Sequence, residues 1–423
     1  TASLAAPHTL PAGVTSLASV DDPANNKPNA REALTPGDRR GLPLSVTWKF
    51  ANHTLDAGAW WEEENSDSIR RLHNVQGGVI TNPFDWSTFI TAYFNQQTKL
   101  STQQYFLKDT IKLLDDQLAI SAGIKALSVT TDFQGYPDST YFDRGQWIHR
   151  KPTYSDWFLP QLGATYALTR SDELFFNYAE NFAAPSTSVI GGTVFDKSKL
   201  RPERAHNFDL GVRTSRGRLS ASLAGYVIEY KNRIGDVTAY DPLGFGTANT
   251  ATNYVNVGRV RGYGTELAVA YSPTRDFRLN LAAAWQSLTY GDNYTEATST
   301  GGTIVRAIKG NTIPNTPRWN ANLDATHFFG PFFIAANAHY QGDVFLTTNN
   351  AQRIPGYTLL GIGVGYDGIS RRGPLKNIRI ALNIENALDR YWFYTNGAST
   401  AFANGSFSVG TPRAYFLTVS GKF

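Results

Sequence analysis

The feature that most constrains this chain is a two-residue alternation of apolar and polar side chains. In the final stretch, GTPRAYFLTVSGKF, Tyr415, Leu417 and Val419 fall on one side of an extended chain, and Thr418 and Ser420 fall on the other. The same alternation recurs in GRLSASLAGYVIEY, FRLNLAAAWQ, RWNANLDAT and NIRIALNIEN. A period of two sustained over so many segments predicts β-strands with one apolar and one polar face.

The connections between these segments alternate in length. Short turns are predicted at residues 169–172, 215–217, 273–276, 329–331 and 368–374. Long polar loops are predicted at residues 136–153, 183–202, 232–253, 290–316, 343–355 and 392–411. A meander of roughly fifteen strands, with short turns at one end and long loops at the other, is the plan of an outer-membrane barrel. The predicted fold class is therefore all-β, a transmembrane antiparallel up-and-down β-barrel.

A soluble β-sandwich or propeller would also alternate apolar and polar positions. The predicted strands run to about ten residues or more, whereas strands of soluble sheets usually have about five or six. Aromatic residues gather at the strand ends, as in NFDLGVR, RYWFY and RWNANL, where a membrane protein places its interfacial girdles. Strand length, loop polarity and aromatic placement together favour the membrane barrel.

Composition excludes several other classes. Mean hydropathy is −0.31, and no run approaches the roughly 20 apolar residues of a membrane-spanning helix. There is no Cys, which excludes thiol chemistry. The net charge is only +4 and the basic residues are scattered along the chain, which argues against nucleic-acid binding. The seven His residues show no metal-ligand spacing, and no G-x-S-x-G motif occurs. We therefore expect no enzyme, no resident cofactor and no metal site.

The chain contains no Met and begins TASLAAPHTLPAG, without a signal peptide. We therefore interpret it as an incomplete or processed chain.

Several stretches resemble the TonB-dependent receptor family, the energy-coupled transporters of the Gram-negative outer membrane. LPQLGATYALTRSDELFFNYAENFAAPS resembles the family's mid-barrel hairpin with its F-x-A-P element, and LRPERAHNFDLGVR resembles the L-x-P-E entry to the next strand. GRVRGYGTELAVAYSP resembles the following G-x-E strand. IRIALNIENALDRYW resembles the penultimate strand, N-x-x-N-L-x-D-x-x-Y, with Ala387 where the family often has Leu, and GTPRAYFLTVSGKF resembles the closing strand. The order and spacing of these motifs cover residues 117–423.

The resemblance implies a barrel of about 22 strands occluded by an N-terminal plug domain. Residues 43–423 would be the C-terminal portion of that barrel, and residues 1–42 an extracellular loop or an unassigned segment. The plug, its TonB box and about seven strands are expected to precede the chain, and fifteen strands alone should not close as a bacterial barrel. The terminal aromatic, Phe423, would lie at the periplasmic end of the closing strand and form part of the signal for barrel assembly.

The function that the resemblance implies is active uptake of a scarce ligand across the outer membrane, with a ferric siderophore favoured. Iron would enter only as part of the transported chelate. A carbohydrate, cobalamin or an aromatic nutrient is the alternative cargo, and a passive diffusion channel is the second alternative. The expected partners are the TonB energy-transducing complex, the ligand, and outer-membrane lipid or lipopolysaccharide around a monomer.

Two sets of residues are candidates for the functional site. Extracellular loops that combine aromatic rings with cations suit anionic ferric chelates and aryl groups. The loop candidates are Tyr141, Arg144, Trp147, His149, Arg150 and Lys151, with Trp392, Phe393 and Tyr394 in a second loop. Polar positions facing the lumen would contact the plug or line a wet passage, namely Arg278, Arg318, Asp324, Arg379 and Glu385. Each set also has an alternative interpretation. Trp and Tyr near strand ends are often membrane anchors, and polar residues that face the lumen can simply be solvated by water.

Overall fold

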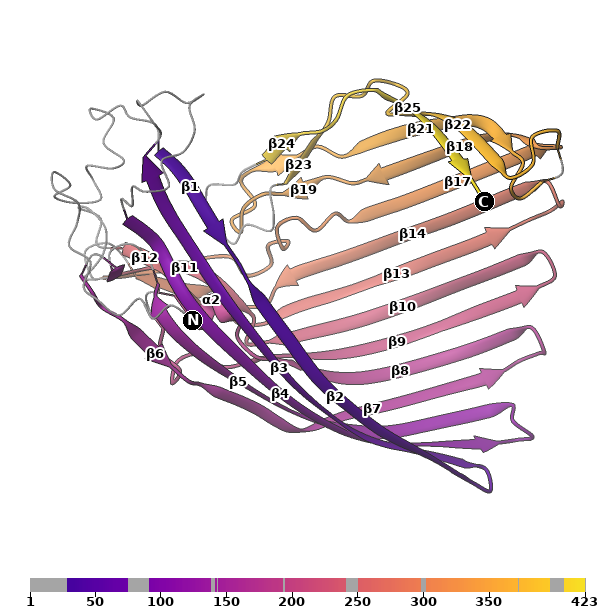
Figure 1. Ribbon diagram of the computed structural model, residues 1–423. Helices are drawn as coiled ribbons and strands as arrows, with labels where there is room; N and C mark the ends of the chain where they lie inside the picture. The colour runs from indigo at the N-terminus through magenta and orange to yellow at the C-terminus, as the bar shows by residue number, and fades with distance from the viewer. Residues whose placement is uncertain are drawn as a thin grey trace.

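The structure, a computed structural model, describes residues 29–74, 91–137, 141–142, 144–192, 195–240, 250–297, 302–371, 373–395 and 407–422. Within these residues the chain forms one large antiparallel sheet that curves into a trough (Figure 1). Phe423 and its predicted role lie outside the described residues. In the same part of the chain, none of the helices has the length and apolar character needed to cross a membrane.

The large sheet contains seventeen strands among the described residues. They are β1 (Asn29–Leu34), β2 (Gly37–Phe50), β3 (His53–Asn74), β4 (Thr91–Leu113), β5 (Leu118–Tyr136), β6 (Ile148–Arg150), β7 (Thr153–Ala167), β8 (Asp172–Ala183), β9 (Glu203–Arg216), β10 (Leu219–Lys231), β13 (Val260–Tyr271), β14 (Phe277–Tyr290), β17 (Trp319–Phe329), β18 (Phe332–Gln341), β21 (Tyr357–Asp367), β22 (Ile378–Glu385) and β25 (Ala414–Gly421).

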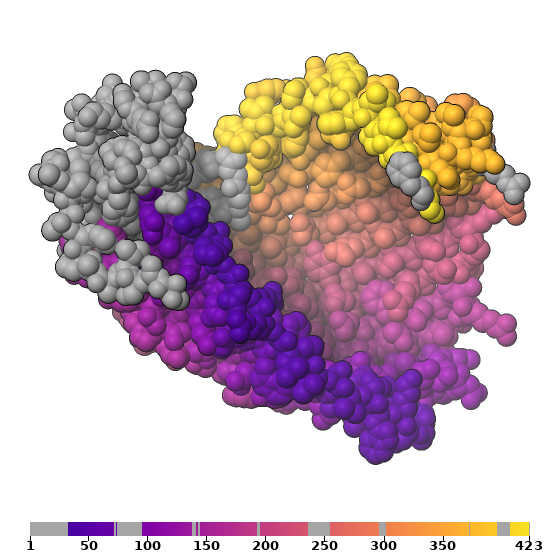
Figure 2. Space-filling view, viewed as in Figure 1, coloured from indigo at the N-terminus to yellow at the C-terminus, as the bar shows by residue number. Residues whose placement is uncertain are grey.

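Each pass of the sheet pairs with the next pass along the chain. Strands β1 and β2 both pair with β3, and β6 and β7 both pair with β5, so the seventeen described strands make fifteen passes. No pairing joins β2 to β25 among the described strands, and Figure 2 shows the hollow of the trough between these two edges. The first of the described strands starts at Asn29, inside the segment of residues 1–42 that the sequence analysis gave as an extracellular loop or an unassigned segment.

The alternation of short and long connections is confirmed. Two residues separate β2 from β3, β9 from β10 and β17 from β18, and all the short turns lie at one end of the sheet (Figure 1). At the other end, four of the long connections carry small hairpins and one carries a short helix. These elements are β11 (Ile234–Tyr240) with β12 (Thr250–Asn256), β15 (Tyr294–Ala297) with β16 (Thr303–Arg306), β19 (Val344–Phe345) with β20 (Arg353–Ile354), β23 (Phe393–Thr395) with β24 (Phe407–Val409), and α2 (Thr187–Ile190).

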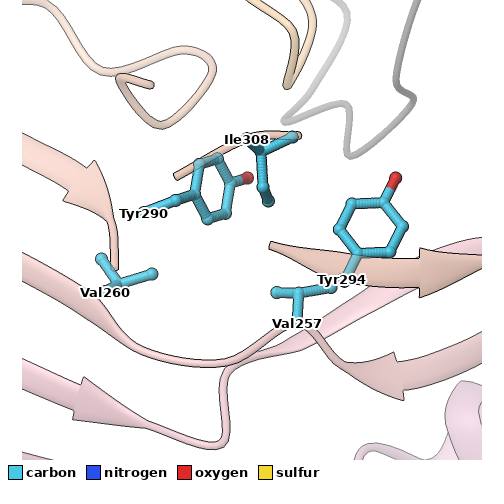
Figure 3. Close-up of a cluster of buried hydrophobic side chains, with 5 residues drawn as sticks. All are labelled: Val257, Val260, Tyr290, Tyr294 and Ile308. Carbon is cyan, nitrogen blue, oxygen red and sulfur yellow. The ribbon is translucent and has the colours of Figure 1, made fainter. Parts of the chain in front are cut away.

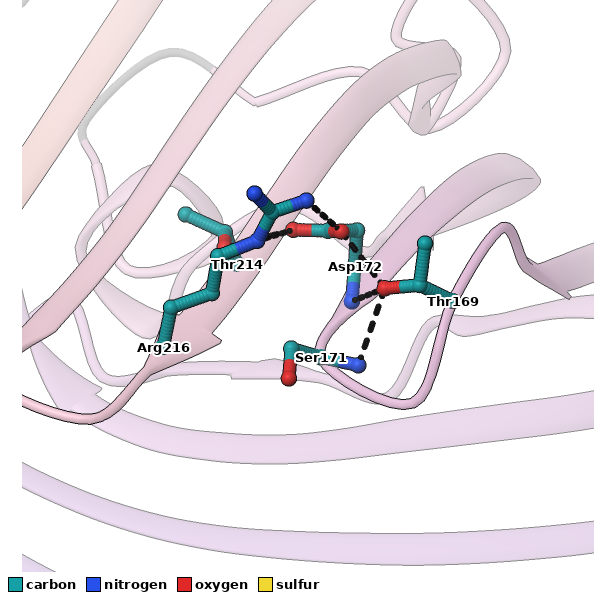
Figure 4. Close-up of polar contacts among 5 residues, drawn as sticks. All are labelled: Thr169, Ser171, Asp172, Thr214 and Arg216. Carbon is teal, nitrogen blue, oxygen red and sulfur yellow. Dashed lines mark hydrogen bonds and ion pairs between the residues drawn. The ribbon is translucent and has the colours of Figure 1, made fainter.

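The turn between β7 and β8 shows how sequence fixes a short connection (Figure 4). The Thr169 hydroxyl oxygen accepts the N–H groups of Ser171 and Asp172, each at 3.1 Å, as hydroxyl-containing residues commonly do in turns. The Asp172 carboxylate accepts hydrogen bonds from the Thr214 hydroxyl at 2.7 Å and from Arg216 Nε at 2.9 Å. The turn is thereby joined to β9 as well as to its own hairpin.

The register confirms the two predicted faces of the sheet. Leu223 on β10 lies beside Val212 on β9 and Leu267 on β13, forming an apolar row on the convex face. The next residue, Ser222, lies beside Arg213 on the opposite face. That second face lines the hollow of the trough, including a cavity of about 490 Å³. The convex face therefore carries the apolar band that would meet lipid.

Aromatic side chains border the convex apolar band at both ends of the strands. At the long-loop end, the ring centroids of Tyr263 and Trp285 are 5.7 Å apart, and those of Trp285 and Trp319 are 6.4 Å apart. At the short-turn end, Tyr271 and Phe329 are 40% and 60% exposed. Two aromatic belts flanking an apolar band are typical of a membrane-embedded barrel, in which each belt lies at one lipid–water interface.

Candidate functional site

The predicted lumen residues lie on the concave face but do not form one cluster. Arg278, near the start of β14, and Arg379, near the start of β22, lie at the short-turn end, and Asp324 lies midway along β17. Glu385 ends β22 at the long-loop end. Arg318 precedes β17, and its carbonyl oxygen accepts the N–H of Gln286 at 2.9 Å. The polar wall therefore has distinct zones along the axis of the trough.

In the loop that follows β5, the predicted site residue Trp147 and a second aromatic residue that was not predicted, Phe142, contact one tyrosine. The rings of Phe142 and Trp147 meet Tyr136 edge-on, with centroids 5.2 and 5.1 Å away. Trp147 remains 43% exposed, Arg144 is exposed, and Tyr141 is half-buried. The tyrosine was not among the predicted site residues, although the alternation placed it at a strand end.

The basic residues of this loop divide between the two faces. His149 lies opposite Gln134 and Arg150 lies opposite Phe133, so these neighbours point in opposite directions. On the convex side, Asp132 accepts a hydrogen bond from His149 Nε2 at 2.8 Å and forms an ion pair with Lys151 Nζ at 2.9 Å. The structure thus separates Arg150 from His149 and Lys151, which the sequence grouped with it.

Arg150 is occupied by main-chain groups. Its guanidinium donates to the carbonyl oxygen of Ile190 at 2.7 Å and to that of Gly192, at the end of α2. It also lies over the Phe195 ring, 5.4 Å from the centroid. Burial lowers the pKa of Arg150 from its usual value, although the group stays cationic at physiological pH because an arginine begins above about 12. Its evident role is to hold the short helix against the strand ends.

The second predicted loop contributes an aromatic row at the long-loop end of the trough. The centroids of Tyr357 and Trp392 are 4.6 Å apart, those of Trp392 and Tyr394 are 5.8 Å apart, and His339 lies 5.9 Å from Tyr357. His339 and Tyr357 are on the concave face by register. Tyr357 is only 8% exposed, whereas Tyr394 is 45% exposed. Sequence analysis found two members of this row and missed the other two.

Trp392 is held in that row by its surroundings. Its indole Nε1 donates to the Thr411 carbonyl at 3.1 Å, and its carbonyl accepts the Gly410 N–H at 2.8 Å. A Cβ at position 410 would overlap the indole ring, so only glycine fits there. Phe393 is not part of the row, because it packs on the cluster that contains Val344.

The neighbouring loops are joined into a platform by an apolar cluster. Val257 and Val260 pack with Tyr290, Tyr294 and Ile308, and all five are at most 6% exposed (Figure 3). These residues come from the long-loop ends of β13 and β14 and from the connections before β13 and after β14. Two long loops are therefore fixed to each other at the rim.

Polar contacts reinforce the platform. The Asn350 side chain accepts the N–H of Thr312 at 2.7 Å and donates to its carbonyl at 2.8 Å, linking the loop after β14 to the loop after β18. Arg259 donates to Asp292 at 3.2 Å through Nε, and this hydrogen bond holds the pKa of Asp292 below its usual range. Among the described residues, no group of three His, Cys, Asp or Glu side chains is arranged to hold a metal ion.

The architecture defines the class of protein: an antiparallel barrel wall with membrane belts, polarised loops and a polar interior. The family model "TonB dependent receptor-like, beta-barrel" matches residues 10–387, and the chain belongs to this family. Its members are transporters and receptors in the outer membrane of Gram-negative bacteria.

Individual relatives agree with this membership. The chain is 24% identical over 277 residues to the probable TonB-dependent siderophore receptor PiuA of Acinetobacter baumannii, covering 64% of this chain and 34% of that protein. The crystal structure of PiuA from Acinetobacter baumannii matches with a TM-score of 0.72 at 17% identity, over 92% of this chain and 56% of that one. The ferric citrate transporter FecA in its unliganded form matches with a TM-score of 0.68 at 21% identity, over 93% and 56%. The chain thus spans about a third of the curated relative and about half of these structures.

Proposed function

We propose that the chain is the ligand-capturing and pore-forming wall of an outer-membrane receptor for active uptake of a ferric siderophore. The observation that carries this proposal is the aromatic row of His339, Tyr357, Trp392 and Tyr394 at the long-loop mouth of the trough. The neighbouring rings of the row are tilted by 42–49° to one another, and exposed aromatic rings suit aryl groups such as catecholates. The similarity to a probable siderophore receptor supports this choice of cargo.

Transport on this proposal involves no covalent chemistry by the chain. The long loops and the aromatic row bind the chelate, iron is present only as cargo, and the polar concave wall keeps the interior wet. TonB supplies the energy by acting on a plug that fills the lumen. The convex apolar band and its aromatic belts meet lipid and lipopolysaccharide, and a single copy suffices because each barrel has its own lumen.

The proposal is tested by titrating the protein, purified from outer membranes, with ferric siderophores, their iron-free forms, cobalamin and oligosaccharides. Tryptophan fluorescence reports binding because Trp392 lies within the row. We expect saturable quenching by one ferric chelate but not by its iron-free form. A response to cobalamin or a sugar, with silence toward every iron complex, would overturn the siderophore assignment.

A variant pair locates the site. Tyr394→Ala removes an exposed ring from the row, and we expect a three- to tenfold weaker affinity, equivalent to about 0.7–1.4 kcal/mol, the usual range for an aromatic pair. Tyr391→Ala is the matched control, because Tyr391 is 69% exposed in the same loop but its ring meets Phe393, outside the row. Equal losses in both variants would show that the row is not the binding surface.

A further inference from the structure

Three arginines surround two phenyl rings at the short-turn end of the concave face. The guanidinium carbons of Arg278 and Arg371 lie 5.5 and 4.3 Å from the centroid of Phe328. Arg379 lies 5.3 Å from the centroid of Phe333, and the two rings are 5.9 Å apart. Both rings are less than 10% exposed and belong to one apolar cluster. Five residues from four strands and one turn thus form a single arginine–phenyl cluster.

The charges of this cluster are only partly compensated. Arg371 forms an ion pair with Asp276 at 2.7 Å. Arg278 and Arg379 have no carboxylate within 4 Å among the described residues. Asp367 lies directly opposite Arg379 in register, but its Oδ1 accepts two N–H groups of its own turn, at 2.9 and 3.2 Å. Within the described part of the chain, the guanidinium groups of Arg278 and Arg379 therefore have no anionic partner.

The phenyl contacts hold each guanidinium near a ring without using its hydrogen-bond donors. The guanidinium carbons of Arg278 and Arg379 lie 5.5 and 5.3 Å from the ring centroids, and a ring attracts the cation but accepts no conventional N–H···O hydrogen bond, so the N–H groups can still donate to an oxygen. An arginine edge matches the two oxygens of a carboxylate, and such charge-assisted pairs are about twice as strong as neutral hydrogen bonds. Nearby described side chains strengthen the positive potential at this end of the sheet: Arg275, Lys376 and Lys422.

We propose that Arg278 and Arg379 form a carboxylate-binding site at the periplasmic mouth of the lumen. The carboxylate has two possible sources: the transported chelate on its way out, or an acidic side chain of a polypeptide segment that fills the lumen. The proposal goes beyond the proposed function, because the site lies at the opposite end of the trough from the aromatic row. It would hold for a different cargo as well.

The test uses the protein purified from outer membranes and the double variant Arg278→Gln/Arg379→Gln. The control is Arg213→Gln, because Arg213 lies on the same face but donates from Nε to Glu173 at 2.6 Å. In the first assay, the affinity for iron-free citrate is measured by calorimetry. In the second assay, the urea concentration is raised, and protease cleavage reports when the polypeptide that fills the lumen is released. The gel mobility of unheated samples shows whether each variant is folded.

Two outcomes support the proposal. If citrate binds the parent protein and the control, and binds the double variant about tenfold or more weakly, the site is open to the chelate. If citrate does not bind the parent, but the lumen segment of the double variant is released at lower urea than in the control, a polypeptide carboxylate occupies the site. The variant Arg278→Lys/Arg379→Lys keeps both charges without the planar edges, and we expect it to fall between parent and glutamine variant.

The proposal is overturned if neither citrate affinity nor segment release distinguishes the double variant from the control. Binding of inorganic phosphate without binding of citrate, together with segment release at the same urea concentration in the double variant and the control, would also overturn it, because the carboxylate assignment would then be wrong. Uptake of radioactive ferric chelates by the parent protein tests the proposed function separately. A parent that imports no ferric chelate contradicts the siderophore assignment, while the citrate and urea titrations still decide on the arginine site.

Discussion

Replacing Leu223 by Arg places a charge in the middle of the convex apolar band. Leu223 is 49% exposed and lies four residues from Leu219, which is beside Tyr271, and four from Val227, which is beside Tyr263. Eight residues at about 3.3 Å each, tilted by about 45°, rise about 19 Å, so position 223 lies near the centre of an apolar band of about 25 Å. An Arg at the midplane of such a barrel costs about 2–4 kcal/mol of folding free energy.

The assay is urea-dependent folding of the protein into phospholipid vesicles, followed by tryptophan fluorescence and by the gel mobility of unheated samples. Ala224→Arg is the control, because the next residue faces the hollow and borders a cavity of about 640 Å³. Val227→Arg lies beside the aromatic belt, and we expect a cost of only about 0–1 kcal/mol there. If Ala224→Arg cost as much folding free energy as Leu223→Arg, the assignment of the two faces would be refuted. If Val227→Arg cost as much as Leu223→Arg, the placement of Leu223 near the centre of the band would be refuted.

Three further predictions concern the rim. Gly410→Ala should displace the Trp392 indole, because a Cβ has no room there, and should shift tryptophan emission to longer wavelength; unchanged emission would show that the ring is not confined. Arg150→Met should remove the donor from two main-chain carbonyls and destabilise the short helix by about 1–3 kcal/mol. The measurement is hydrogen exchange across residues 187–192, which should become faster. Unaltered exchange would show that Arg150 does not hold the helix. Asp292→Asn should lower the urea midpoint at neutral pH. Because Arg259 depresses the pKa of Asp292, this stabilisation is complete above the unfolded pKa of about 3.9 and is lost as pH falls through the lower folded pKa. The difference from the parent should therefore narrow only below about pH 4, and a difference that vanished near pH 6 would contradict the pairing.

The two faces of the sheet could be predicted from sequence because a strand has a fixed period. In RWNANLDAT, the observed register places Asn322 opposite His339 on the concave face, and every residue of the stretch then lies on the side predicted for it. The stretch GIGVGY, in which glycines alternate with larger residues, is likewise part of a strand, β21. The observed connections also follow the predicted order, since turn residues mark the short ones and long polar stretches mark the others.

The site could be predicted only in part, because side-chain neighbours in a barrel come from strands that are distant in sequence. Arg371 and Asp276 pair across 95 positions, and no local pattern indicates that contact. The register between β5 and β7 shifts between Lys125 and Leu127, and the two-residue alternation does not predict this shift either. Sequence proximity also misled: His149 and Arg150 are adjacent, yet they face opposite sides of the sheet.

The two ends of the trough offer different chemistry to anything that passes through it. At the long-loop mouth, Trp392 and the exposed Tyr394 offer aromatic rings beside a platform of fixed loops, which suits capture of an aryl group. At the short-turn mouth, Arg278 and Arg379 present N–H edges, which suit a carboxylate. An anionic aromatic chelate would then contact first the aromatic row, which binds its rings, and last the two arginines, which bind its carboxylates. Two successive sites of different chemistry favour passage over retention, because neither site alone binds every group of the ligand. Energy coupling is still required to open the path between them, and the double arginine variant shows whether the second site belongs to that path or to the polypeptide that closes it.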